Sequence, residues 1–208
     1  MAHRLKDYPS VSLLPEQVQG KLNFSTLFGR CAPVHLEIGS GKGTFLVNEA
    51  QAATDTDFLG IEWASKYYRY AVDRIGRWEL TNVRLIRTDA AVFLRDHVDD
   101  HTADCFHIYY PDPWPKKRHN KRRFICKDNM DQILRILKTG GHLRIVTDHA
   151  DYYEHMDEVL RDYSHRFRPL TFRPTAGAKT GERVGTNFER KYLKEERLAF
   201  SIALEKTS

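Results

Sequence analysis

Short apolar runs alternate with longer amphipathic segments along most of the chain. The apolar runs have the composition of buried parallel strands and occupy residues 34–38, 57–61, 83–86, 105–109 and 142–146. The segments between them place apolar residues at helical spacing, as in Tyr68, Ala71, Val72 and Ile75. This alternation predicts an α/β domain with a doubly wound, mostly parallel sheet and helices on both of its faces.

Capping residues mark where several of these helices are expected to begin. Ser65 precedes one apolar helical face and Asp128 precedes another, and both residue types favour the N-cap position. Near the end of the sequence, Phe200, Ile202 and Leu204 alternate with smaller residues, which predicts a half-buried strand. A closing pair of strands is therefore expected after the last βα unit.

The first part of the chain shows no such periodicity. Prolines and glycines interrupt it at Pro9, Pro15, Gly20 and Gly29. We therefore expect residues 1–32 to form an arm packed on a single domain that spans residues 33–208, and the length of 208 residues is sufficient for one such domain.

Composition excludes several classes of protein. The chain is 41% hydrophobic and 29% charged, as is usual for a soluble globular protein, and no apolar run reaches the roughly 18 residues of a membrane span. The first residues have no signal-peptide pattern, so a cytoplasmic location is expected. The three cysteines form no Cys-x-x-Cys pair and the ten histidines have no metal-ligand spacing, so we expect neither a disulfide framework nor a bound metal.

A glycine turn follows the first buried strand. Gly39, Gly41 and Gly43 lie between residues 34–38 and a helical segment, where glycines let the backbone approach a nucleotide at a helix N-terminus. Glu62 comes 21 residues after Gly41, at the end of the next strand, where an acid can accept hydrogen bonds from a ribose diol.

Two ligands compete for this turn. A dinucleotide fingerprint requires a small residue where the chain has Thr44, whereas the spacing Gly-x-Gly-x-Gly is commoner in enzymes that use S-adenosylmethionine (SAM). The ammonium group of SAM calls for an acid near the turn, and Glu37 is placed there. Asp89, after the third strand, fits an adenine amine and a helix N-cap equally well.

A proline-rich and then basic stretch follows the fourth strand, from Tyr109 to Phe124. Asp112 and Trp114 each precede a proline and are expected to be extended, so the stretch is expected to be a stiff loop without helix or strand. Six of the eight residues from 116 to 123 are Lys or Arg; removing six positive charges from the formal net charge of +5 leaves −1. This pattern indicates a nucleic-acid contact, although a solvated charged surface has the same composition.

The segment 174–185 is polar and contains glycines, which predicts a mobile loop. Thr186 and Glu189 then have the spacing of a capping box, which predicts that a helix starts there.

With these residues in view, the chain resembles the bacterial tRNA (guanine-N7-)-methyltransferases, which are class I SAM-dependent enzymes. The most specific motif is Pro-Asp-Pro-Trp-Pro-Lys-Lys-Arg-His, beginning at Pro111. Supporting motifs begin at Leu36, Gly60, Thr147 and Thr186, and the similarity runs from about residue 33 to residue 205. The resemblance implies a seven-stranded Rossmann-like methyltransferase sheet, SAM and tRNA as ligands, no metal, and methylation of guanine N7 at position 46 in the variable loop of tRNA.

The resemblance also implies roles for individual residues. The expected cofactor contacts are Glu37, Gly39, Gly41, Glu62, Asp89 and Asp112, with Asp112 also catalytic. The expected substrate contacts are Lys116, Asp148, Thr186, Asn187, Phe188 and Glu189. The expected RNA contacts are Arg118, His119, Asn120, Lys121, Arg122 and Arg123. Three positions depart from the family pattern, His149, Lys191 and Tyr192, and they bear on the shape of the guanine pocket. The family implies no obligatory partner protein and leaves a monomer or a homodimer open.

The chemistry of guanine agrees with this interpretation. N7 carries an in-plane lone pair, so it needs alignment and charge compensation and no general base. A carboxylate on the N1–H and N2–H₂ edge would bind more strongly as positive charge develops on the ring. The residues themselves leave three alternatives: an NAD-dependent oxidoreductase, a non-catalytic RNA-binding module, and a methyltransferase for adenine N6.

Overall fold

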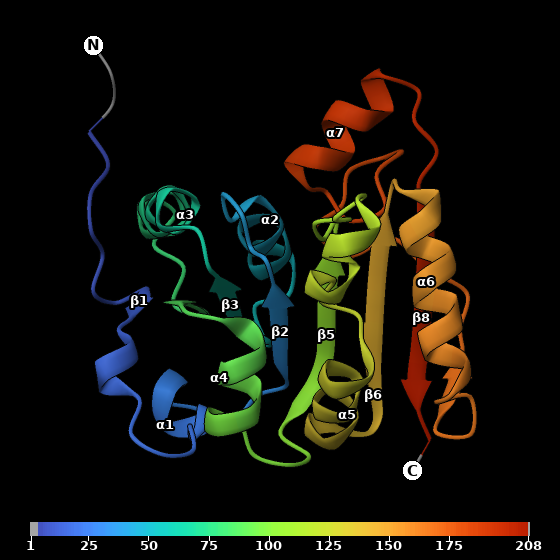
Figure 1. Ribbon diagram of the computed structural model, residues 1–208. Helices are drawn as coiled ribbons and strands as arrows, with labels where there is room; N and C mark the ends of the chain where they lie inside the picture. The colour runs from blue at the N-terminus through green and yellow to red at the C-terminus, as the bar shows by residue number, and fades with distance from the viewer. Residues whose placement is uncertain (1–3, 208) are drawn as a thin grey trace.

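The computed structural model describes residues 4–207, which form an eight-stranded sheet flanked by helices (Figure 1). The strands are β1 (Ser12–Leu13), β2 (Val34–Ile38), β3 (Asp57–Glu62), β4 (Val83–Arg87), β5 (Ala103–Tyr109), β6 (Leu137–Thr147), β7 (Phe167–Pro169) and β8 (Phe200–Lys206). The helices are α1 (Phe24–Phe28), α2 (Thr44–Ala52), α3 (Ser65–Arg77), α4 (Ala90–His97), α5 (Lys127–Ile136), α6 (Ala150–Arg161) and α7 (Asn187–Lys194), with 3₁₀ turns η1 (Pro15–Gln17) and η2 (Lys117–Arg122).

The strands lie in the order β1-β4-β3-β2-β5-β6-β8-β7. Every neighbouring pair from β1 to β6 is parallel, and β8 runs antiparallel to both β6 and β7. The order reverses between β2 and β5, so the connections from these two strands leave in opposite directions. In open α/β sheets, ligands bind at such a reversal, beyond the carboxyl ends of the strands.

The prediction of a doubly wound, mostly parallel sheet is confirmed, but the sheet has eight strands and not seven. The additional short strand is β1, which comes from the segment predicted to be an arm. Ser12 and Leu13 pair with Leu85 and Ile86 of β4. A two-residue strand has too short a pattern to be recognised from periodicity.

Two hydrophobic clusters pack on opposite faces of the sheet, because neighbouring side chains of a strand point to opposite sides. On one face, Phe45 of α2 and Ile75 of α3 pack with Phe58 of β3. On the other face, Phe93 of α4 and Met130 of α5 pack with strand residues, together with Tyr152 and Met156 of α6. Helices on both faces are therefore confirmed.

The predicted helix starts need two corrections. Helix α3 begins at Ser65 itself, with Ala64 at the N-cap and no side-chain cap. Helix α5 begins at Lys127 with Cys126 at the N-cap, so Asp128 lies in the first turn, where a carboxylate interacts favourably with the helix dipole.

Candidate active site

Acidic residues from five consecutive parallel strands meet at the carboxyl edge of the sheet. Glu37 lies near the end of β2 and Glu62 ends β3, while Asp89, Asp112 and Asp148 follow β4, β5 and β6. Helix α7 lies across this same end of the sheet (Figure 1). The edge thus gathers the carboxylates that the sequence predicted for a single site.

The glycine turn between β2 and α2 is held open by left-handed backbone. Gly39, Gly41 and Gly43 have φ angles of 77°, 54° and 68°, which residues with a Cβ rarely adopt. At Gly43 a Cβ would also lie 3.0 Å from the Cβ of Ala71. The turn therefore requires glycine at all three positions for conformation, and at Gly43 for space as well.

Glu62 fixes this turn to the end of β3. Its Oε2 accepts a hydrogen bond from the Gly41 amide at 2.8 Å, and its Oε1 accepts one from the Ala64 amide at 2.7 Å. Burial raises the pKa of Glu62, and the negative charge of Asp112 acts in the same direction. Each carboxylate oxygen has a further lone pair, so Glu62 can still accept hydrogen bonds from a ligand hydroxyl.

Glu37 is the group in this site that most clearly lacks a partner. Its side chain is only 4% exposed, and Oε2 is buried without a hydrogen bond. Burial raises the pKa of Glu37 to about 8, with a further contribution from the charge of Glu62, while the Ser40 hydroxyl opposes the shift. A buried carboxyl group without a partner is costly, and a cationic ligand group would satisfy it.

Asp89 acts as the N-cap of α4. Its side chain accepts a hydrogen bond from the Val92 amide at 3.0 Å, and it is exposed. The helix-cap interpretation is therefore confirmed, and contact with an adenine amine stays a prediction.

The stretch after β5, predicted to be a stiff loop without helix or strand, contains a short 3₁₀ helix. The basic residues form the 3₁₀ turn η2, because the Lys116 carbonyl accepts from the His119 amide at 2.7 Å and the Asn120 carbonyl accepts from the Arg123 amide at 2.9 Å. Trp114 has a φ of 43°, so it is in the left-handed region and not extended as expected. A following proline disfavours the right-handed helical region. Trp114 avoids that region by adopting a left-handed conformation instead of an extended one.

Arg123 corrects the prediction of a uniformly exposed basic surface. Its side chain is 2% exposed, and it donates from Nε to the Pro113 carbonyl at 2.9 Å. Its guanidinium also pairs with Asp151 and lies 4.9 Å from the centre of the Tyr152 ring. It is therefore placed to support the loop from inside the protein.

The other residues predicted to bind RNA or substrate in this stretch remain accessible. Lys116, Arg118, Lys121 and Arg122 are exposed, and His119 and Asn120 are half-buried. The Arg122 guanidinium lies 4.9 Å from the centre of the Trp114 ring, and Trp114 contacts His119 edge-on. These cations lie on the same connection as Asp112.

The predicted capping box at α7 is half confirmed. Thr186 is the N-cap, and its hydroxyl accepts from the Glu189 amide at 3.0 Å. The Glu189 carboxylate does not return to the Thr186 amide; it accepts instead from the amides of Arg183, Val184 and Gly185, at 2.6, 3.0 and 2.7 Å. Glu189 is 3% exposed and holds the backbone before α7, and its contact with substrate stays a prediction.

The preceding segment, predicted to be a mobile loop, is anchored at both ends. The Glu49 carboxylate accepts from the amides of Ala176 and Gly177, and the Asn48 amide nitrogen donates to the Gly185 carbonyl. Val184 is completely buried, so this mostly polar segment has an apolar anchor.

A group of aromatic side chains borders the site. The sequence indicated Phe188 as a substrate contact and Tyr192 as a position that bears on the guanine pocket, but it did not indicate Tyr110. The ring centre of Tyr110 lies 6.2 Å from that of Phe188 and 5.5 Å from that of Tyr192. Arg197 lies over the Tyr192 ring and pairs with Asp148 at 3.3 Å. Phe188 is half exposed, whereas Asn187 is exposed. Phe188 and Tyr192 have i, i+4 spacing, which predicts that their rings are neighbours on one face of a helix.

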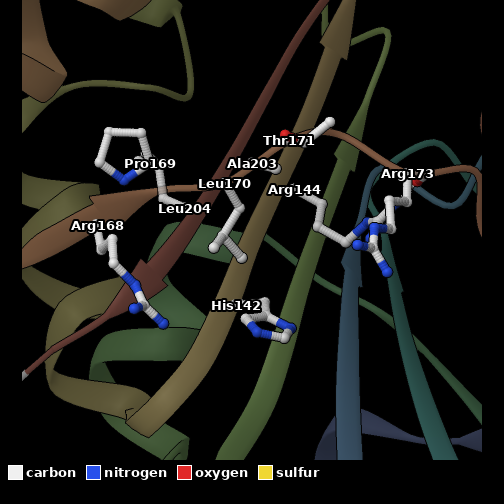
Figure 2. A pocket seen from close by; sticks show the side chains of 9 residues that line it. All are labelled: His142, Arg144, Arg168, Pro169, Leu170, Thr171, Arg173, Ala203 and Leu204. Carbon is white, nitrogen blue, oxygen red and sulfur yellow. The ribbon is translucent and has the colours of Figure 1, made fainter.

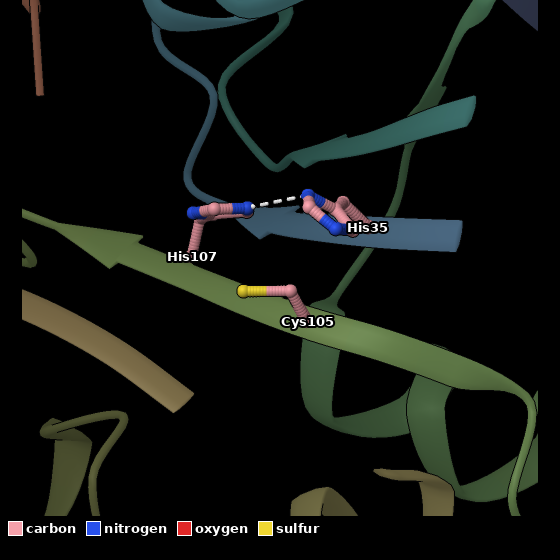
Figure 3. A group of neighbouring side chains, drawn as sticks. All are labelled: His35, Cys105 and His107. Atoms are coloured by element: carbon pink, nitrogen blue, oxygen red, sulfur yellow. Dashed lines mark hydrogen bonds between the residues drawn. The ribbon is translucent and has the colours of Figure 1, made fainter. Parts of the chain in front are cut away.

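A second group of side chains lies within the sheet, away from the carboxyl edge. Ligand-type atoms of His35, Cys105 and His107 lie within 4.8 Å of one another (Figure 3). Both ring nitrogens of His107 are already engaged, one with His35 Nδ1 at 3.0 Å and one with the Tyr109 hydroxyl at 2.7 Å. Burial lowers the pKa of His35 to about 4 and lowers the pKa of His107 well below its usual value, so both rings are neutral. We assign this group to the packing of the sheet and propose no metal there.

In the described part of the chain, no helix is long and apolar enough to cross a membrane.

Comparison with known proteins places the chain in a family. Residues 31–202 match the methyltransferase family Methyltransf_4. The tRNA (guanine-N(7)-)-methyltransferase of Alkalilimnicola ehrlichii is 35% identical over 202 residues, which cover 96% of this chain and 83% of the relative. The protein of the same name from Rhodopirellula baltica is 37% identical over 153 residues, or 71% of this chain and 56% of the relative, so the match spans little more than half of that protein.

Solved structures support the fold. The aminoglycoside resistance methyltransferase NpmB1 superimposes with a TM-score of 0.57 and 18% sequence identity, over 84% of this chain and 87% of that one. At this identity the likeness concerns the fold alone.

Proposed function

Because the chain belongs to the family of tRNA (guanine-N(7)-)-methyltransferases, we propose that it transfers the methyl group of SAM to N7 of a guanine in tRNA, at position 46 of the variable loop. The observation that carries the proposal is the arrangement at the carboxyl edge. There Glu37, with a buried and unpaired Oε2, and the turn-bound Glu62 lie at the ends of β2 and β3, and the exposed Asp112 lies on the connection from β5 to the basic turn η2.

The cofactor part of the site fits SAM by the chemistry of its groups. Glu37 offers a buried carboxyl group that can ionise to pair with the methionine ammonium, and Glu62 offers acceptors for the ribose hydroxyls. Gly39 has open space beside its Cα, so a ligand can approach the backbone there. When bound, SAM supplies an electrophilic methyl group on a sulfonium centre.

Asp112 is the carboxylate we assign to the guanine. It is exposed and follows β5 on the loop that Arg123 supports, and no described residue donates a hydrogen bond to its carboxylate. Its negative charge would compensate the positive charge that develops on the purine, so it would stabilise the transition state more than the ground state. Glu189 is buried and already accepts from three backbone amides, and Asp148 is paired with Arg197.

The RNA would be held by the remaining cations of the basic turn. Lys116, Arg118, Lys121 and Arg122 face solvent, as phosphate contacts require. Phe188 and Tyr110 offer aromatic faces beside the site, on which a base can stack.

We expect a cytoplasmic enzyme that acts as a monomer or a homodimer without an obligatory partner protein. We also expect residues 1–32 to act as an arm on the domain formed by residues 33–208; of these, residues 1–3 and 208 lie outside the described part of the chain.

The test is methyl transfer from labelled SAM to unmodified tRNA, followed by nucleoside analysis and mapping. We expect label in 7-methylguanosine at one guanine of the variable loop. A matched tRNA with 7-deazaguanine at that position lacks the reacting nitrogen and should accept no methyl. Label in N6-methyladenosine, or binding of tRNA without any transfer, would contradict the proposal.

A further inference from the structure

A cavity of about 580 Å³ opens on the face of the sheet that carries α2 and α3, over β6 and β8 and away from the carboxyl edge. Four of its lining side chains are basic or can become so: His142 and Arg144 on β6, Arg168 on β7, and Arg173 on the segment that follows β7. Figure 2 shows Arg144 and Arg173 on one side of the cavity, Arg168 on the other and His142 between them.

The charge in this cavity is not balanced by the protein. The Glu205 carboxylate pairs with cations of this cavity. Arg168 donates to both of its oxygens, at 2.8 and 2.9 Å. The Nε2 atom of His142 lies 3.9 Å from the same carboxylate. Arg144 and Arg173 form no ion pair with any described residue, so two guanidinium groups are left for an external anion.

Arg144 is also held in place before any ligand arrives. Its guanidinium stacks 4.5 Å from the centre of the Phe172 ring and donates a hydrogen bond to the Arg173 carbonyl. A guanidinium with a fixed plane loses little freedom when it binds an anion, and its fork matches phosphate oxygens. The Nε atom of Arg144 is buried without a partner, so this side chain keeps unused donor capacity.

The cavity is connected to the proposed active site by two chain segments. From Arg144, β6 reaches its carboxyl end at Thr147 in three residues, a distance of roughly 10 Å. From Arg173, the chain continues through the anchored segment to Thr186 and α7. A polyanion bound at the carboxyl edge therefore has this cavity within reach.

We propose that this cavity binds a backbone phosphate of tRNA, as a second contact apart from the basic turn η2. The proposal rests on the proposed function only in taking tRNA as the source of the phosphate. A phosphate bound between Arg144 and Arg173 would hold the start of the segment that leads to α7.

The test measures tRNA affinity over a range of KCl concentrations for the full chain and three variants. The Arg173 side chain is exposed, so the Arg173→Gln variant should fold normally. The Arg144→Gln variant removes the guanidinium that stacks on Phe172. Arg161→Gln on α6 is the matched control, because Arg161 is exposed on the opposite face and is paired with Asp157. The melting temperature and SAM affinity of each variant establish that it is folded.

We expect Arg173→Gln and Arg144→Gln each to flatten the log–log salt slope by about 0.7–0.9, the loss of one phosphate contact. Affinity at low salt should fall about fivefold, the scale of one exposed ion pair, while SAM binding and the control remain unchanged. A folded Arg173→Gln variant with the wild-type slope would overturn the proposal.

A thermal shift with inorganic phosphate separates the two sources of the anion. Stabilisation by phosphate that Arg173→Gln abolishes, combined with an unchanged tRNA slope, would identify a free-anion site and overturn the assignment to tRNA. Methyl transfer to the expected guanine with an unchanged slope would refute this inference alone. A flattened slope with the methyl group on another base would refute the proposed function alone.

Discussion

Arg123 donates a hydrogen bond from Nε to the carbonyl oxygen of Pro113, across 2.9 Å. Pro113 directly follows Asp112, so a buried guanidinium holds the backbone next to the proposed catalytic carboxylate. Asp151 and the ring of Tyr152 hold the guanidinium in turn. The position of Asp112 thus depends on a residue that the sequence placed among the RNA contacts.

Replacing Arg123 by Lys should lower kcat for methyl transfer by about ten- to a hundredfold, because a small displacement of a catalytic group has effects of this size. Lysine keeps the charge but cannot reach Pro113 and Asp151 with one planar group. Single-turnover kinetics would measure the effect, with melting temperatures as a check on folding. Arg161→Lys on α6 is the matched control, because the Arg161 side chain is exposed and lies outside the proposed site. An unchanged rate for Arg123→Lys would show that Arg123 does not position Asp112.

The Glu37 carboxyl should make SAM binding depend on pH. Its pKa, raised by burial to about 8 in the free protein, means that it is largely protonated at pH 6 and must ionise to pair with the SAM ammonium. Affinity should therefore rise by up to about tenfold per pH unit towards pH 8, with release of a proton. Calorimetry in buffers of different ionisation enthalpy would measure that proton. Glu37→Gln should bind SAM weakly at every pH, and a wild-type profile that is flat from pH 6 to 8 would argue against the assignment.

The same group has the opposite effect on stability. Because the folded pKa of Glu37 lies above its unfolded value, the folded protein binds more protons between about pH 4.5 and 8. The contribution of Glu37 to the free energy of unfolding should therefore fall as pH rises through that range. Glu37→Gln should lose this part of the pH dependence.

Asp112→Asn should lower kcat by about 10²–10³, the scale of removing one preorganised electrostatic group, with smaller changes in SAM and tRNA binding. Since N7 carries no proton, the wild-type transfer step should be flat above about pH 6 once the site is saturated with SAM. Rapid-quench measurements would give both results. A rate that climbs through neutral pH, and stops climbing in Asp112→Asn, would instead indicate proton abstraction from an exocyclic amine.

Glu189→Gln should destabilise the segment before α7 by about 2 kcal/mol, because hydrogen bonds to a charged group contribute about 1.5–3 kcal/mol and an amide has only one acceptor oxygen. Chemical denaturation would measure the loss, and hydrogen exchange would locate it at residues 183–185. Glu195→Gln, at the C-terminal end of the same helix, should have a much smaller effect. Equal stability of Glu189→Gln and the wild type would show that the Glu189 carboxylate does not stabilise this segment.

Sequence patterns predicted the parts of the site that follow directly from strand periodicity. Glu62 directly follows one buried apolar run and Asp112 comes three residues after the end of another, and parallel strands bring such residues to one edge. Arg123 and Glu189 could not be interpreted in this way. Their burial depends on Asp151 and on the backbone of residues 183–185, and no local spacing encodes those contacts. The exposed part of the basic run therefore ends at Arg122, and Arg123, the last basic residue of the run, is buried.

The same limit applies to the sheet. β1 pairs with a strand about seventy residues away, and its two residues carry no period of their own. The cavity over β6 was equally hidden, because His142 and Arg144 meet Arg168 and Arg173 only through the pairing of β6, β8 and β7.

The position of β8 has a consequence for how the protein matures. It is the last strand along the chain, yet it lies between β6 and β7 and pairs with β6 from His142 to Thr147. On the ribosome, β6 must therefore wait with an open edge until the final strand has been synthesised, and an unpaired edge is exposed to other nascent chains. The strand that leads to Asp148 acquires its last neighbour only then, so methylating activity should arise only after β8 has been synthesised.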